Sequence, residues 1–244
     1  MVIIMNRTKK IIVAVLIIVL IILAAIVVSV IFLGNNSKLT EGDKNILVCA
    51  IDESEQRPGM GACDMAFIVR LNNGTLKDYV AFYPGGMAHP TASEPEEYQK
   101  QGAGPKLLMH DSFYGEDANK DMQLAKEIVQ YNTNITIDNV VAVNTEALDA
   151  VLKAAGPLEI NGTTVTNASG LDIIREENWN QGVSRGEAVL DIVKAASKKA
   201  KDPDIKSAMV NAAMDQYSKG NIVMDNQGDF ISLLASKGIE TFFN

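Results

Sequence analysis

Acidic and basic side chains flank the short apolar runs in the first part of this chain, in a pattern that suits phosphate or divalent-ion chemistry. Asp52 follows the apolar run 45–51, and Asp64 opens the next run, 64–71. Arg57 lies between them, in a segment that carries Gly and Pro. Two carboxylates can hold Mg2+, and an arginine can bind an anion through two parallel N–H bonds. Asp52 and Asp64 are therefore candidate metal ligands and Arg57 a candidate anion ligand. The plainer alternatives are a turn cap for Asp64 and a solvated side chain for Arg57.

Two glycines and two arginines complete the set of candidate ligand-binding residues: Gly85, Gly86, Arg175 and Arg185. A Gly-Gly pair lets the backbone approach a ligand closely. Arg185 follows the predicted helix cap Ser184, where its charge adds to the positive end of the helix dipole. Ion pairs with neighbouring glutamates on an exposed helix surface are the alternative for both arginines.

Three predicted strands position the first candidates: 45–51, 64–71 and 76–83. Asn73-Gly74 joins the last two as a hairpin, because Asn and Gly tolerate the positive φ values of a type I′ turn. If the first two strands are also antiparallel, the end of the first, the start of the second and the end of the third meet at one sheet edge. We expect that edge to gather Asp52, Arg57, Asp64 and the 83–90 loop.

The rest of the chain alternates predicted helices and strands. Helical spacing covers 118–131, 145–155, 184–200, 205–219 and 227–237, strand patterns cover 137–143 and 239–243, and Asn161-Gly162 indicates a second hairpin between 158–160 and 163–165. This interleaving predicts a layered α/β domain.

An uncharged stretch of 23 residues, 11–33, precedes this domain and is long enough to cross a bilayer as a helix. Arg7, Lys9 and Lys10 stand just before it, so the positive-inside rule places residues 1–10 in the cytoplasm. Because no small-residue cleavage site follows, we expect an uncleaved single-pass anchor in the cell membrane. Residues 34–44 are then a tether, and 45–244 form one extracellular domain.

The charge balance and the cysteine count narrow the range of partners. The chain has 30 Asp and Glu against 22 Lys and Arg, and three of those basic residues precede the anchor. An acidic external domain without a basic stripe argues against nucleic acid as a partner. Cys49 and Cys63 allow either an external disulfide or buried free thiols.

Four segments of the sequence resemble a known family. They are 45–52 (NILVCAID), 63–69 (CDMAFIV), 141–148 (VAVNTEAL) and 155–160 (AGPLEI). They are similar to the extracytoplasmic domain of LytR-CpsA-Psr proteins, and more closely to the related domain-of-unknown-function family 4012. The resemblance spans most of 45–201 and includes the N-terminal anchor.

This resemblance implies an α/β/α sandwich with a mixed central sheet. It also implies, with Mg2+ as the cofactor, transfer of a glycan phosphate from a polyprenyl pyrophosphate to an envelope polymer. Asp52 and Asp64 fall on acidic residues of the family, Arg175 and Arg185 on its later arginines, and Arg57 occupies the loop that holds another. Arg57 and Asp64 are thus the implied catalytic residues.

Two positions depart from the family motifs. Ala62 stands where an arginine is expected, and Gly85-Gly86 stand where arginine and aspartate are expected. Two functions stay open at this point, both in envelope assembly. One is a glycan phosphotransferase acting on a lipid-linked glycan, and the other is a non-catalytic module that binds an envelope glycan or a protein.

Overall fold

The structure is a computed structural model that describes residues 38–55, 57–82, 84–160, 162–166 and 198–226, with single positions at 192, 195, 196 and 228. Within these ranges no helix is both long and apolar enough to cross a membrane. The expected anchor at 11–33 and the expected strand at 239–243 lie outside the described residues, as do most of the helices expected at 184–200 and 227–237.

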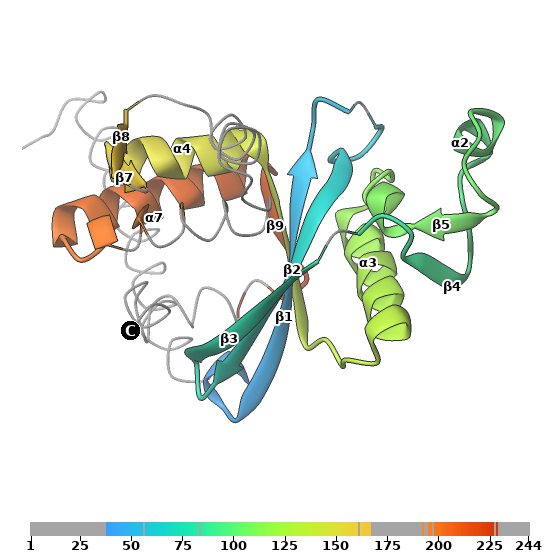
Figure 1. The fold of residues 1–244 in the computed structure, drawn as a ribbon, viewed down its shortest axis with the longest axis horizontal. Helices are drawn as coiled ribbons and strands as arrows, with labels where there is room; N and C mark the ends of the chain where they lie inside the picture. The colour runs from blue at the N-terminus through green and yellow to red at the C-terminus, as the bar shows by residue number, and fades with distance from the viewer. Residues whose placement is uncertain are drawn as a thin grey trace, which may run out of the picture.

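A five-stranded sheet lies at the centre of the domain (Figure 1). Its strands are β1 (Asp43–Asp52), β2 (Ala62–Asn72), β3 (Thr75–Phe82), β6 (Asn139–Asn144) and β9 (Ile222–Met224), in the order β3-β2-β1-β6-β9. β1 pairs antiparallel with β2 and parallel with β6, while β2–β3 and β6–β9 are antiparallel. The predicted mixed central sheet is confirmed.

Helices and small hairpins surround this sheet. They are η1 (Lys38–Thr40), β4 (Ala88–Ser93), α2 (Glu96–Lys100), β5 (Lys106–Leu108), η2 (Met109–Asp111), α3 (Ala118–Thr133), α4 (Thr145–Ala155), β7 (Leu158–Ile160), β8 (Thr163–Val165) and α7 (Pro203–Ser218). β4 pairs with β5 and β7 with β8, each as a separate antiparallel hairpin.

The centre of the sheet is buried on both faces, which makes the domain three layers deep. On one face, Leu47 and Cys49 of β1 pack with Met122 and Ile128 of α3 in one buried cluster. On the other, Ile46 belongs to a cluster that includes α4 and α7 residues. Because successive side chains of a strand point to opposite faces, β1 can serve both clusters. Figure 1 shows α3 on one side of the sheet and α4 with α7 on the other.

The sequence patterns predicted most of these elements. The α4 helix has the expected bounds, and the strands β1, β2, β3 and β6 and the helix α3 differ from expectation by a few residues at their ends. In the β2–β3 turn, Asn73 and Gly74 have φ values of 50° and 76°, as a type I′ turn requires. The short elements β4, α2, β5 and β9 were not predicted, because segments of three to six residues are too short to show a clear periodicity.

Cys49 and Cys63 are both buried free thiols in this structure. They lie on neighbouring strands, where Cys49 is opposite Ala66 and Cys63 is opposite Ile51. Burial and the adjacent Cys63 thiol raise the pKa of Cys49 well above its ordinary value. Cys49 is therefore an unreactive core residue rather than a nucleophile.

A carboxylate from the loop after β1 caps the first turn of α4. The backbone N–H groups of Thr145 and Glu146 donate to Glu53 at 2.9 and 3.1 Å, and the Thr145 hydroxyl also donates to this carboxylate. Asn144 caps the next amide, that of Ala147. This pairing ties the loop after β1 to the helix that follows β6.

We expect Glu53→Ala to lower the free energy of unfolding by about 1 kcal/mol, because amides in the first turn of α4 lose a side-chain acceptor. Urea titration of the full chain measures this change. Glu116→Ala is a matched control at an exposed position and should have little effect. Equal losses in the two variants would show that the cap does not stabilise the domain.

Candidate functional site

The ends of three strands gather polar residues at one end of the sheet. Asp52 lies opposite Ala62, so the end of β1 and the start of β2 adjoin. β3 pairs antiparallel with β2, with Phe82 opposite Ala66, and its end therefore reaches the same region. The 84–87 turn that follows β3 is held to the site segment by the Met109 amide, which donates to the Met87 carbonyl. The structure thus brings Asp52, Asp64 and the Gly85-Gly86 turn to the expected edge.

A β-bulge aims the Asp64 side chain into the site. In the β1–β2 register, Ala50 pairs with Met65 and Ile51 pairs with Cys63, which leaves Asp64 as the extra residue. Cys63 can then enter the core beside α3 while Asp64 points to the same side of the sheet. Bulges of this kind often redirect a side chain next to a functional site.

The loop between β1 and β2 is fixed closely against the 109–115 segment. The Gly59 amide donates to the Tyr114 carbonyl at 3.0 Å. A Cβ atom at Gly59 would lie 2.0 Å from the carbonyl oxygen of Gly115, so only glycine fits this approach. The loop therefore holds Glu55 and Arg57 at defined positions.

Arg57 forms its closest described contacts with Asp111. Its Nε and Nη2 atoms donate to Asp111 Oδ1 at 3.1 and 2.8 Å, and Glu55 Oε2 lies 3.4 Å from Nη2. The guanidinium also stacks on the Tyr98 ring, 4.8 Å from its centroid, which adds a cation–π contact. The Arg57 charge is thus largely matched by a buried carboxylate.

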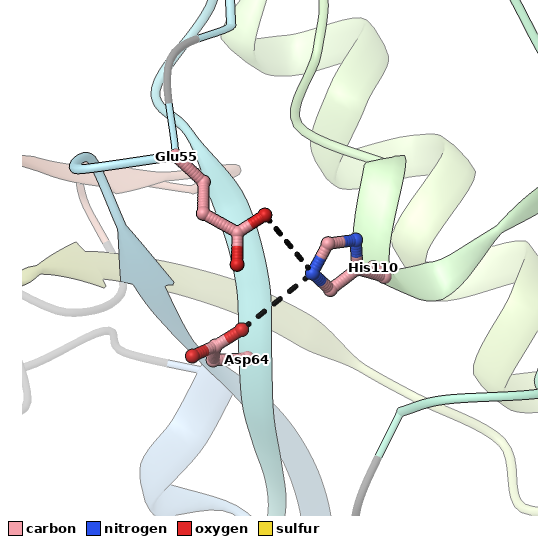
Figure 2. Close-up of side chains that lie close together, drawn as sticks. All are labelled: Glu55, Asp64 and His110. Carbon is pink, nitrogen blue, oxygen red and sulfur yellow. Dashed lines mark ion pairs between the residues drawn. The ribbon is translucent and has the colours of Figure 1, made fainter. Parts of the chain in front are cut away.

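His110 stands between three carboxylates, two of which, Glu55 and Asp64, are drawn in Figure 2. Its Nε2 atom lies 3.5 Å from Glu55 Oε2 and 3.6 Å from Asp64 Oδ1, and its Nδ1 atom lies 3.3 Å from Asp111 Oδ1. In Figure 2, Glu55 from the loop after β1 and Asp64 from β2 both point toward this ring. Hydrogen bonds with Asp111 and Asp64 raise the pKa of His110 to about 10. Without a metal ion, the imidazole is therefore a cation at neutral pH.

Asp111 is the shared partner of this network and is 6% exposed. Burial opposes its ionisation, yet hydrogen bonds from His110 and Arg57 hold the pKa of Asp111 below its ordinary value. Glu94 is buried beside it, with one oxygen accepting the Leu108 amide and the other, Oε1, lacking a hydrogen-bond donor. Burial, with the nearby Asp111 charge, raises the pKa of Glu94 to about 7, so that a protonated Glu94 can donate to Asp111.

Three described residues can hold a metal ion together, namely Glu55, Asp64 and His110. One ligand atom of each lies within 4.8 Å of those of the other two. Asp64 was an expected ligand, whereas Glu55 and His110 were not. Asp52, the other expected ligand, is 5% exposed, accepts the Ser54 amide at 2.8 Å, and is not part of this group. An Asp52–Asp64 metal pair stays a prediction.

Magnesium, the ion implied by the sequence resemblance, fits this group poorly. Mg2+ takes oxygen ligands and keeps several waters, and Asp64 and Glu55 meet that preference. His110 does not meet it, because imidazole nitrogen is a ligand that transition metal ions prefer. Its Nε2 atom lies beside both carboxylates, so an ion bound by them would also contact this nitrogen.

The other predicted site residues divide into two groups. Gly85 and Gly86 lie in the exposed turn before Met87, and Gly86 has a φ of 88° with open space around the position of a Cβ. Arg175 and Arg185 lie outside the described residues, so their roles stay predictions. The sequence did not identify Glu55, Glu94, His110 and Asp111 as site residues. His110 and Asp111 carry one local signal, a histidine next to an aspartate after a short apolar run, and Glu55 and Glu94 carry none.

A Ser-His-Asp mechanism has no support at His110-Asp111-Ser112. The His110 ring contacts Asp111, its neighbour in the chain, as the histidine and aspartate of such a triad would. The Ser112 hydroxyl is fully buried and donates to the Met109 carbonyl at 2.8 Å. It is therefore unavailable as a nucleophile.

We expect His110 in the metal-free chain to titrate near pH 10, well above an ordinary histidine at about 6.5. Since the raised pKa favours the folded protonated form, this contribution to stability is complete below about pH 6.5 and is lost as the pH rises through 10. NMR of the imidazole signals measures the pKa directly. A midpoint near 6.5 would contradict the described network.

Glu94→Gln tests the carboxyl pair. The wild-type chain should lose stability as the pH rises from 4.5 through 7, because a protonated Glu94 is favoured in the folded state. Glutamine keeps a donor for Asp111 and should remove this pH dependence. Urea titrations across that range measure it, with exposed Glu97→Gln as the control. A Glu94→Gln variant that keeps the pH dependence of the wild-type chain would show that protonation of Glu94 does not stabilise the fold.

Comparisons with known proteins agree with this fold. In the solved structures, a Streptococcus agalactiae protein, gbs0355, matches with a TM-score of 0.54 and 15% identity over 86% of this chain and 79% of its own. Bacillus subtilis TagV matches with a TM-score of 0.50 and 14% identity over 82% of each chain. An Enterococcus faecalis protein described as a transcriptional regulator, EF0465, matches with a TM-score of 0.52 and 16% identity over 85% of this chain and 76% of its own.

These likenesses show a shared fold, which agrees with the α/β architecture that the sequence resemblance implies. No curated protein matches the sequence. The model of a family described as a protein of unknown function, DUF4012, matches residues 41–179, more than half of the chain. The chain therefore belongs to the DUF4012 family.

Proposed function

We propose that this chain is a single-pass membrane protein of cell-envelope assembly whose extracellular domain binds a polyprenyl-pyrophosphate-linked glycan. The apolar stretch 11–33, with basic residues before it, supports the anchor and the external orientation. The resemblance of segments 45–52, 63–69, 141–148 and 155–160 to LytR-CpsA-Psr domains supports a role in the envelope, and the fold shared with TagV agrees with that resemblance. The anchor would hold the domain within reach of a lipid carrier in the same membrane.

The observation that carries the proposal is the meeting of Arg57, Asp64 and the 84–87 turn at one end of the sheet. These segments are distant in the chain and share no local pattern. A convergence of charged side chains and a glycine turn beside strand ends is typical of a ligand site in an α/β domain.

The described part of the site needs further positive charge to hold a pyrophosphate. Two cations, Arg57 and protonated His110, stand among the carboxylates of Glu55, Asp64 and Asp111, which leaves one negative charge in excess. We assign the missing cations to Arg175 and Arg185. Bidentate arginines suit a pyrophosphate head group.

Binding without turnover is the version we favour. Arg57 donates hydrogen bonds from both Nε and Nη2 to Asp111, so these two groups are not directed at an incoming phosphate. The departures at Ala62 and at Gly85-Gly86 also remove charged groups that transfer would use to stabilise developing charge. A glycan phosphotransferase of the same fold is the second candidate function.

The description of the Enterococcus faecalis neighbour as a transcriptional regulator is not carried over to this chain. An identity of 16% carries the fold alone. The excess of acidic residues would repel a phosphate backbone.

The test is retention of the lipid. The full chain is purified from its membrane in mild detergent, and bound lipids are extracted and identified by mass spectrometry. We expect a polyprenyl phosphate or pyrophosphate, with or without its glycan. Combined Arg175→Ala and Arg185→Ala should reduce its amount by about tenfold or more, since each charged hydrogen bond contributes about 1.5–3 kcal/mol.

Arg70→Ala is the matched control for loss of a positive charge. Arg70 lies on β2 and pairs with Asp78 of β3, so its loss should leave lipid retention unchanged. Arg57→Ala is a poor test, because it would leave the buried Asp111 charge without its partner. A wild-type chain that retains no polyprenyl lipid would overturn the proposal, and measurable phosphoryl transfer would favour the second candidate.

A further inference from the structure

The donor set of Glu55, Asp64 and His110 calls for a different ion from the one expected. We propose that these three residues form a binding site for a divalent first-row transition metal ion of the Zn2+ class, ligated by two carboxylates and the Nε2 atom of His110. The inference goes beyond lipid binding and does not depend on it.

The distances suit a single ion placed among the three side chains. Around a tetrahedral Zn2+ with bonds of about 2.1 Å, neighbouring ligand atoms lie about 3.4 Å apart. In the metal-free structure His110 Nε2 lies 3.5 Å from Glu55 Oε2 and 3.6 Å from Asp64 Oδ1. The two carboxylate oxygens lie within 4.8 Å of each other and would have to approach by up to about 1.4 Å to close on an ion.

The second ring nitrogen of His110, Nδ1, contacts a carboxylate, as is usual for histidines that bind a metal ion. Histidine ligands commonly donate their second ring N–H to a carboxylate, which fixes the tautomer and the ring orientation. Asp111 Oδ1 lies 3.3 Å from His110 Nδ1 and is itself held by two Arg57 bonds. With Nδ1 occupied by Asp111, Nε2 is the nitrogen presented to Glu55 and Asp64.

The chain's other histidine has a different environment. His89 is 4% exposed, and its Nδ1 accepts the Ala92 and Thr91 amides at 2.7 and 3.1 Å. Its Nε2 contacts Glu127 at 2.8 Å. Both ring nitrogens of His89 are thus used within the fold, whereas His110 Nε2 faces two carboxylates.

The site is open enough to exchange an ion and to take a further ligand. The side chains of Glu55, Asp64 and His110 are 44, 25 and 27% exposed. Three protein ligands around Zn2+ leave a fourth position for water or an anionic oxygen, as in reactive rather than purely structural zinc sites. Such an ion would also offset the negative charge of this end of the sheet.

The experiment measures metal selectivity in the full chain. The protein is purified in detergent, stripped with a chelator, and dialysed against Zn2+, Co2+ or Mg2+, with bound metal measured by elemental analysis. We expect one tightly bound Zn2+ per chain that a hundredfold excess of Mg2+ does not displace. Bound Co2+ should show the visible absorption of a site with a nitrogen ligand. Failure to bind Zn2+, or equal competition by Mg2+, would overturn the proposal.

Substitutions in the three ligands locate the ion. Glu55→Gln, Asp64→Asn and His110→Gln should each weaken Zn2+ binding by about tenfold or more. The matched controls are Glu127→Gln and His89→Gln, the other histidine–glutamate pair of the chain. Equal losses in the controls and the site variants, or none in either, would refute the assigned ligands.

A measurement on the wild-type chain covers the case in which a variant fails to fold. Mn2+ added to a chain with 15N-labelled histidine should broaden the His110 ring signals well before those of His89. Equal broadening of both would contradict the site. These assays measure bound metal rather than bound lipid, so their failure is distinguishable from failure of the lipid-binding proposal.

Discussion

The buried carboxylate of Asp111 is the constraint on which the rest of this site depends. A charge that is 6% exposed must be paired, and Asp111 is paired with Arg57 on one side and His110 on the other. These contacts join the loop after β1 to η2. Arg57 in turn contacts Glu55, and His110 contacts both Glu55 and Asp64, so these two carboxylates are linked to the same aspartate.

The backbone supplies the conditions for this network. Gly59 permits the loop after β1 to pass against the carbonyl of Gly115, and the bulge at Asp64 turns a second carboxylate toward the same histidine. Glu53 ties the same loop to α4. An ordered loop of this kind, between two strands of a sheet that is covered on both faces, can hold charged groups in place before a ligand arrives.

The fold was more accessible from sequence than the site. β1, β2, α3 and α4 carry apolar periodicity and clear turn residues, and their prediction needed only local information. Asp64 and Arg57 were found because they flank those strands. His110, Asp111 and Glu94 lie in the segment of short elements between β3 and α3, where no periodic pattern indicates a functional residue. Their importance comes from contacts such as that between Arg57 and Asp111, 54 positions apart, which no local pattern encodes.

The most direct test of this account is a double-mutant cycle on the free energy of unfolding, with Arg57→Met, Asp111→Leu and the two combined. Each single substitution removes the closest partner of a largely buried charge and should cost up to about 3–5 kcal/mol. The account predicts that the double variant loses much less than the sum of the two single losses. Additive losses would contradict it, because they would mean that the pair does not hold this end of the sheet together.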